Sequence, residues 1–184
     1  MIRYSDIDAY LNALQADPAL AVISSKMAAE ALAITPAAVE RQIEKGSLEG
    51  IRIGKVRCVT ASSIFAAKDA HEKKVAKIRR ALEQLATKGE TTVYAPIMAL
   101  IGMKTKVPKD RAAIGAMLGE ISRDTQASHR FLLSALVFNS NARKPSPSFF
   151  GLARDLGYDV DDEQKFLSRH LKRIHKHYLG AASA

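Results

Sequence analysis

The stretch between Thr60 and Gly89 contains no helix breaker, and this feature constrains the fold more than any other. The Thr60 hydroxyl can cap the start of a helix, and a glycine such as Gly89 can end one at little cost. The pattern therefore predicts one long helix near the middle of a 184-residue chain. We expect an N-terminal module at residues 1–67, a connecting helix at 68–90 and a C-terminal module at 91–184.

The connecting helix carries residues at coiled-coil spacing, but the first half of this row is polar. Steps of four and three relate Ile64, Lys68, His71, Val75, Ile78, Leu82 and Leu85. Two apolar heptads make a marginal coiled coil, whereas a helix that packs on its own domain needs no second chain. Both interpretations stay open, and we favour a homodimer through Val75, Ile78, Leu82 and Leu85.

Composition excludes several classes of protein. Although 47% of the residues are hydrophobic, no apolar run approaches the roughly 18 residues of a membrane span. The first residues lack the basic flank and apolar stretch of a signal peptide, so we expect a cytoplasmic protein without membrane contact. The single cysteine, Cys58, lacks the companions of a disulfide, zinc or CxxC site.

The net charge of +9 is unevenly distributed along the chain. The excess of basic over acidic groups is 0 in residues 1–67, +3 in 68–90 and +6 in 91–184. A basic balance suits a polyanionic partner, because each Lys or Arg near a phosphate releases counterions. An ordinary basic protein without such a partner is the alternative.

The N-terminal module shows helix signals followed by a hairpin. A capping box at residues 5–8 predicts a first helix that ends at residues 17–18, and Ser24 or Ser25 can cap a second helix. Thr35 followed by proline starts a third helix, which runs to Lys45 and is closed by a glycine. Segments 50–53 and 56–59 are rich in β-formers and predict two strands joined across residues 54–55.

Residues 23–64 resemble the winged helix-turn-helix of the excisionase and MerR-like families. The resemblance rests on a capped "AAE" helix, a Thr-Pro helix start, a Gly-x-Leu exit and a basic wing before a new helix cap. It implies that the helix at 36–45 enters the DNA major groove and that the wing follows the backbone or the minor groove. It also implies dimerisation through the helix after the wing. The residues that would then face DNA are Ala37, Ala38, Glu40, Arg41 and Glu44.

The charges of this module agree only partly with that implication. Arg41 can bind guanine with two hydrogen bonds, and Arg52, Lys55 and Arg57 can hold phosphates. Two carboxylates on the same helix, Glu40 and Glu44, are tolerated only if they accept from cytosine or pair with Arg41 and Lys45. A winged helix that contacts protein is the alternative.

The C-terminal module begins with helix signals at residues 96–101 and 111–122. The second of these helices has one apolar stripe and a smooth opposite face that includes Gly115 and Gly119, so we expect something to approach that face closely. The continuous apolar run at 131–138 predicts a buried strand. A polar turn with Arg143 and Lys144 follows it, and a basic helix ends near Leu179.

Residues 94–157, and notably "LLSALVFN" and "PSPSFFGLARDLG", resemble a winged-helix module of bacterial proteins, and distantly the DNA-binding half of alkylguanine transferases. The transferase activity is not carried over, because residues 128–130 read Ser-His-Arg where Cys-His-Arg is required. No common catalytic motif occurs, and the histidines of the last helix lack metal-pair spacing. We expect no enzyme, no metal and no cofactor.

These observations predict a mainly α protein with short β wings, composed of two winged helix-turn-helix modules joined by a long helix. The expected function is sequence-specific binding of double-stranded DNA in transcription regulation in a bacterium, phage or plasmid. The alternatives are a protein-binding adaptor in a phage, plasmid or defence assembly, and an architectural DNA-binding protein. The expected DNA-binding residues are Thr35, Ala37, Ala38, Glu40, Arg41, Lys45, Arg52, Lys55, Arg57, Lys109, Arg111, Arg143 and Lys144.

Overall fold

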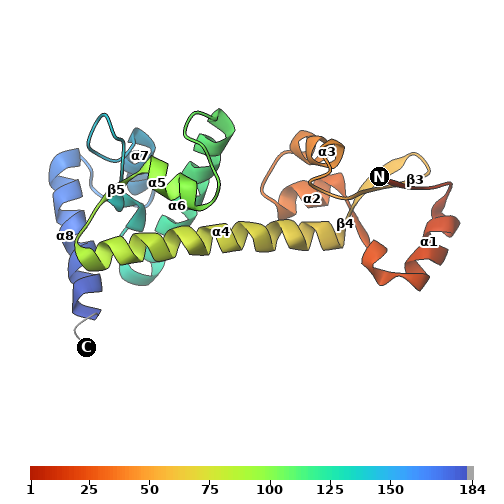
Figure 1. Cartoon of the computed structure of the whole chain (residues 1–184), viewed down its shortest axis with the longest axis horizontal. Coiled ribbons are helices and arrows are strands. Elements are labelled where there is room, and N and C mark those ends of the chain that lie inside the picture. Colours follow the sequence, from red (N-terminus) through yellow and green to blue (C-terminus); the bar gives the residue numbers. More distant parts are fainter. Residues whose placement is uncertain (182–184) are drawn as a thin grey trace. The chain divides into compact units, whose positions relative to one another are not determined.

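The computed structural model describes residues 1–181, which form eight α-helices, two 3-10 helices and six short strands (Figure 1). The expected mainly helical fold with small sheets is confirmed. The chain divides into two compact units, unit 1 at Met1–Glu72 and unit 2 from Lys73 onward. Their boundary lies within α4 (Ala61–Lys88), which is the long helix expected between Thr60 and Gly89.

Unit 1 contains three helices and four strands before α4. In chain order they are β1 (Ile2–Tyr4), α1 (Ile7–Ala16), the 3-10 helix η1 (Pro18–Leu20), β2 (Val22–Ser24), α2 (Ser25–Ala31), α3 (Pro36–Glu44), β3 (Gly50–Ile53) and β4 (Val56–Thr60). The expected caps at Ser24 and Thr35 are confirmed, since each side chain accepts a backbone N–H three residues on. The capping box expected at residues 5–8 is wrong by one residue, because Asp6 caps α1 through the Ala9 amide.

The expected hairpin is the centre of a larger sheet. The strand order is β1-β3-β4-β2, in which β1 pairs parallel to β3 and β2 pairs antiparallel to β4. The two outer strands have three residues each, which is too short for an alternating pattern to identify them. The pairing of β2 with β4 holds the start of α2 at the hairpin.

The core of unit 1 lies between α2, α3 and the sheet. Val39 and Ile43 of α3 are buried against Ala28 and Ala29 of α2 and against Val59 of β4. These residues point inward at helical spacing, so the opposite face of α3 is left exposed.

Unit 2 contains the second half of α4 and four further helices. Two short strands and a 3-10 helix lie between them. The order along the chain is β5 (Thr92–Val93), α5 (Tyr94–Leu100), α6 (Pro108–His129), the 3-10 helix η2 (Leu133–Leu136), β6 (Val137–Phe138), α7 (Pro147–Asp155) and α8 (Glu163–Ala181). β5 and β6 form a parallel two-stranded sheet.

The prediction of a strand at residues 131–138 is wrong for most of these residues. Residues 131–137 are buried as expected, but Leu133–Leu136 form a 3-10 helix and only Val137–Phe138 form a strand. Consecutive backbone amides here bind side chains instead of a neighbouring strand. The Leu133 amide donates to Thr125 Oγ1 at 3.2 Å, and the Ser134 amide donates to Ser122 Oγ at 3.1 Å.

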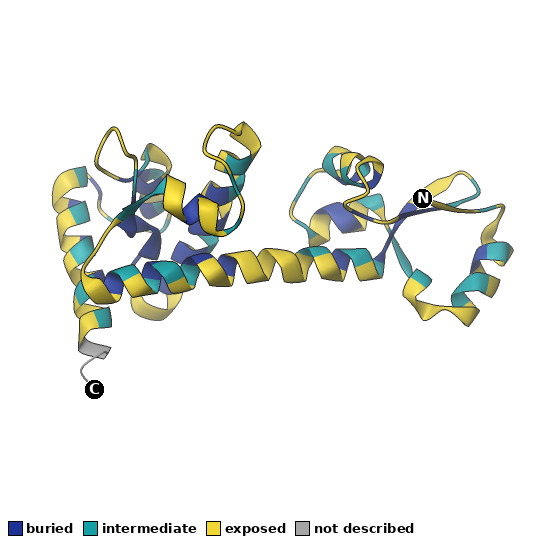
Figure 2. Ribbon diagram, in the orientation of Figure 1, coloured by how far each residue is buried: buried dark blue, intermediate teal, exposed yellow. Residues whose placement is uncertain are grey.

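The apolar row of α4 is part of the core of unit 2 (Figure 2). Val75 is 8% exposed, Ile78 and Leu82 are fully buried, and Leu85 packs against the same cluster. Three of these residues are therefore covered within their own unit and Leu85 is partly covered, so the structure gives no support to the homodimer expected through them. Within residues 1–181 no helix has the length and apolar character to cross a membrane.

Candidate nucleic-acid interface

The outward face of α3 is small near its start, and its second half carries the exposed residues Arg41, Glu44 and Lys45. Thr35 and Ala37 are exposed and Ala38 is half-buried, so little side-chain bulk covers the start of this face. Arg41 follows one turn after Ala37, and its Nε–H donates to the Ala37 carbonyl at 3.3 Å. This bond aligns the side chain with the helix and leaves its terminal nitrogens available. Lys45 ends the helix and is exposed.

Glu40 does not face outward as a free carboxylate. Its Oε1 accepts a hydrogen bond from Ser25 Oγ at 2.7 Å, and its Oε2 accepts from Arg57 Nη1 at 2.6 Å. These bonds, the Ser25 hydroxyl first and then the Arg57 guanidinium, hold the pKa of Glu40 below its usual value. Glu40 therefore links α2, α3 and β4, and the pairing that we considered with Arg41 or Lys45 is not found.

The same contact changes the role expected for the wing. The charge of Arg57 is directed to Glu40, and the Nε–H of Arg52 donates to the Gly54 carbonyl at 3.0 Å across the turn. Gly54 has a φ of +55°, which suits a glycine at this position. Lys55 at the tip is exposed and forms no hydrogen bond within the part of the chain that the structure describes. Lys55 is thus the exposed cation of the wing, and the half-buried Arg52 keeps its terminal nitrogens available beside it.

The two units differ sharply in charge. Unit 1 carries eight Lys and Arg against nine Asp and Glu, whereas unit 2 carries twenty against ten. Their formal charges are −1 and +10, so the entire basic excess of the chain belongs to unit 2. The net long-range attraction of the chain to a polyanion therefore comes from unit 2.

The four cations expected to bind DNA in unit 2 do not lie together. Lys109 is exposed in the first turn of α6. Arg143 and Lys144 lie in the turn that an Asn139–Lys144 bridge closes, in a groove of about 770 Å³ with Asp161, Asp162 and Glu163. Lys144 Nζ is 3.0 Å from a Glu163 oxygen. Acidic side chains therefore lie close to the two cations at the tip of this loop, so the loop does not present the basic surface that was expected of a wing.

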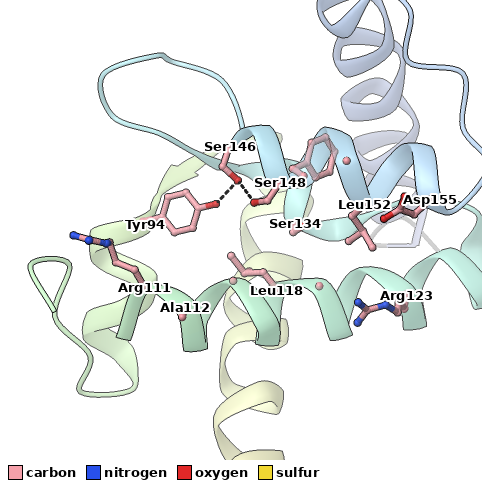
Figure 3. Close-up of a pocket in the computed structure, with 14 residues that line it drawn as sticks. Tyr94, Arg111, Ala112, Leu118, Arg123, Ser134, Ser146, Ser148, Leu152 and Asp155 are labelled. Atoms are coloured by element: carbon pink, nitrogen blue, oxygen red, sulfur yellow. Dashed lines mark hydrogen bonds between the residues drawn. The ribbon is translucent and has the colours of Figure 1, made fainter. Parts of the chain in front are cut away.

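Arg111, the fourth cation, lines a groove of about 500 Å³ between α6 and α7 (Figure 3). Its other lining residues are Tyr94, Ala112, Gly115, Leu118, Gly119, Arg123, Ser134, Ser146, Ser148, Phe149, Gly151, Leu152 and Asp155. The smooth face of α6 that the sequence indicated forms part of this groove. The residues of α5 and α7 were not predicted, because they join this face only when the three helices pack together.

Hydroxyl groups line one end of the groove. Tyr94 Oη donates to Ser146 Oγ at 3.1 Å, and Ser146 Oγ is 2.8 Å from Ser148 Oγ (Figure 3). Ser146 precedes α7 but does not cap it with its side chain. Figure 3 places Arg111 near this end and Arg123 near the other, at the same end as Asp155 of α7.

Two side chains with reactive chemistry outside these surfaces, Cys58 and His170, are buried. Burial raises the pKa of the Cys58 thiol, which disfavours its reactive thiolate form. His170 is 5% exposed, and its Nε2 accepts from the Leu132 amide at 2.7 Å. Among residues 1–181 no group of three or more His, Cys, Asp or Glu side chains is arranged to hold a metal ion.

Comparison of this chain with known proteins found no match. The chain matches no protein-family model, no curated protein and no solved structure.

Proposed function

We propose that this chain binds double-stranded DNA and reads its sequence with α3, as a transcription regulator does. The observation that carries the proposal is the arrangement of α3. Its inner face packs in the core through Val39 and Ile43, and its outer face combines small residues with Arg41. A helix with little bulk at its start can approach base edges closely, and an arginine one turn later can bind guanine with two hydrogen bonds.

The Glu40 contacts support this assignment by pairing one of the two carboxylates of α3, while Glu44 stays exposed at the end of the helix. A free carboxylate on a helix in the major groove would repel phosphates on both sides. Glu40 instead accepts hydrogen bonds from Ser25 and Arg57; the Arg57 charge balances that of Glu40, and this contact fixes the hairpin against α3. The helix, turn, helix and hairpin of residues 25–60 are thus held as one element. Unit 2, with a formal charge of +10, would supply attraction to the DNA backbone.

Replacing Arg41 with alanine is expected to relax sequence preference. A bidentate contact to guanine contributes about 1–3 kcal/mol of discrimination, so preference for the best site falls by roughly 5- to 150-fold. The measurement is fluorescence anisotropy of the preferred duplex and a scrambled duplex across a salt series. Lys55→Ala is the control, because loss of a phosphate contact weakens both duplexes equally and lowers the salt slope by about one unit. Equal loss on both duplexes for Arg41→Ala would reject the groove assignment.

A second candidate function, the protein-binding adaptor, is favoured by the exposed apolar side chains of unit 1. Those at least half exposed are Met1, Ile7, Leu11, Met27, Val56 and Phe65, with Phe65 reaching 70%. Unit 1 is also nearly neutral, which suits protein contact better than phosphate contact. Failure to bind any duplex at low salt would favour the adaptor, whereas cooperative coating without sequence preference would favour an architectural protein.

A further inference from the structure

The groove between α6 and α7 is shaped by the absence of side chains on both of its walls. A Cβ atom built at Gly115 of α6 or at Gly151 of α7 would have no other atom within 4 Å. Neither glycine has a positive φ, so the backbone does not require glycine at these positions. Glycine within a helix costs about 1 kcal/mol relative to alanine. What these glycines provide is open space.

Hydrogen-bond donors line the two ends of this space. Arg111 and Arg123 are twelve residues apart on α6, which corresponds to about 18 Å along the helix axis. The Arg123 guanidinium forms no hydrogen bond or ion pair within residues 1–181, and Arg111 donates only to the Thr105 carbonyl, at 3.2 Å. The hydroxyls of Tyr94, Ser146 and Ser148 add further groups that can bind an oxyanion.

We propose that this groove binds the sugar–phosphate backbone of a nucleic acid strand. Two arginines whose backbone positions lie about 18 Å apart along the axis of α6 suit an extended polyanion better than one compact anion, since phosphates repeat every 3.4 Å along the axis of a duplex strand. The charge of +10 on unit 2 provides the matching long-range attraction. Backbone contacts of this kind position a protein without reading bases. The inference shares with the proposed function the nucleic acid as ligand, but it depends on neither α3 nor sequence preference.

Asp155 is the one acidic residue among the fourteen that line the groove. Figure 3 shows it at the Arg123 end, where it would repel a phosphate. Replacing it with asparagine keeps the size of the side chain and removes the charge. Asp155→Asn is therefore expected to strengthen duplex binding by roughly two- to fivefold, on the scale of one screened charge pair.

The decisive variant fills the groove without changing any charge. Gly115→Leu places an apolar side chain in the open space, and it also replaces glycine with a good helix former, so the fold is expected to persist. Ala116→Leu is the matched control, because Ala116 is exposed on the same helix and is not among the groove residues. Binding of the full-length protein to a labelled duplex of arbitrary sequence is measured by fluorescence anisotropy, after circular dichroism has verified the fold.

Gly115→Leu is expected to weaken duplex binding about tenfold or more, while Ala116→Leu stays within about twofold of the unchanged protein. Arg123→Gln is expected to lower the slope of affinity against salt by about one unit. Arg169→Gln, which removes an equal charge from outside this groove, is expected to leave the slope unchanged. Equal duplex affinity for Gly115→Leu and the unchanged protein would overturn the proposal.

The remaining outcomes separate this proposal from the proposed function. If Arg41→Ala abolishes sequence preference but Gly115→Leu has no effect, the groove assignment fails and the function of α3 stands. If the protein binds all duplexes equally and Gly115→Leu weakens that binding, the groove assignment stands and the proposal that α3 reads the DNA sequence fails. Binding of a polyglutamate peptide that Gly115→Leu abolishes, without any effect on duplex binding, would assign the groove to an acidic peptide and overturn the nucleic-acid ligand.

Discussion

Replacing Leu82 with alanine is expected to lower the free energy of unfolding of unit 2 by about 2–5 kcal/mol and to leave the oligomeric state unchanged. Leu82 is fully buried in a cluster with Ile78 and Ala86 of the same helix and with residues of α6 and α8. Truncation therefore removes buried methyl groups and leaves a cavity. Chemical denaturation followed by circular dichroism measures the first effect, and sedimentation equilibrium measures the second.

The neighbouring Gln84 provides the control for this experiment. Its side chain is exposed on the same helix, so Gln84→Ala is expected to change the unfolding free energy by no more than about 0.5 kcal/mol. The heptad spacing around Leu82 fits either an intermolecular seam or an internal core. If Leu82→Ala converted a dimer into a monomer, and if stability depended on protein concentration, the seam would be intermolecular and the packing described here would be wrong.

Unit 2 is expected to lose stability in mild acid because of His170. Its Nε2 accepts the Leu132 amide hydrogen, so the ring must carry its proton on Nδ1 and remain neutral. The rings of Phe149, Tyr158 and Phe166 surround it. Burial, with a smaller contribution from the Arg173 charge, lowers the pKa of His170 from 6.5 to about 4.

The direction of the pH dependence follows from this shift. Between pH 6.5 and about 4 the unfolded chain binds a proton at His170 that the folded chain does not bind. The contribution of His170 to stability is therefore complete above pH 6.5 and is lost as the pH falls toward 4. A shift of this size corresponds to roughly 3 kcal/mol.

Comparison with His170→Gln isolates this contribution from that of other titrating groups. A glutamine amide oxygen can also accept the Leu132 amide hydrogen, but it does not titrate. When the pH is lowered from 7 to 4, the unchanged protein is expected to lose roughly 3 kcal/mol more of its unfolding free energy than the variant loses. A difference independent of pH, or an NMR titration of His170 near 6.5, would contradict the assigned environment.

Local signals in the sequence predicted much of the fold. The starts of α2 and α3 depend on Ser24 and Thr35, which act within three residues, and the hairpin turn depends on Gly54. The apolar run at residues 131–138 is buried as expected, but burial alone does not distinguish a strand from a 3-10 helix. The distinction depends on acceptors from other segments, such as Thr125 and His170, which no local pattern reveals.

In the candidate sites, too, the features set by neighbouring residues were predicted, and the features set by contacts between distant segments were not. The outward position of Arg41 follows from the helical spacing of α3 and was predicted. The pairing of Glu40 with Arg57 joins residues seventeen apart and was not predicted. For the groove in unit 2, the sequence indicated Arg111 and the smooth face of α6. It did not indicate Tyr94 or Arg123, because the groove appears only when α5, α6 and α7 pack together.

The most direct test of sequence-specific DNA binding is selection of duplexes by the full-length protein from a random pool, followed by anisotropy on the enriched and scrambled sequences. Specific sites usually bind about a thousandfold or more tighter than other DNA. The account predicts an enriched site whose preference is about a hundredfold or more at physiological salt and falls when Arg41 is replaced. Absence of enrichment, together with no duplex binding even at low salt, would contradict it.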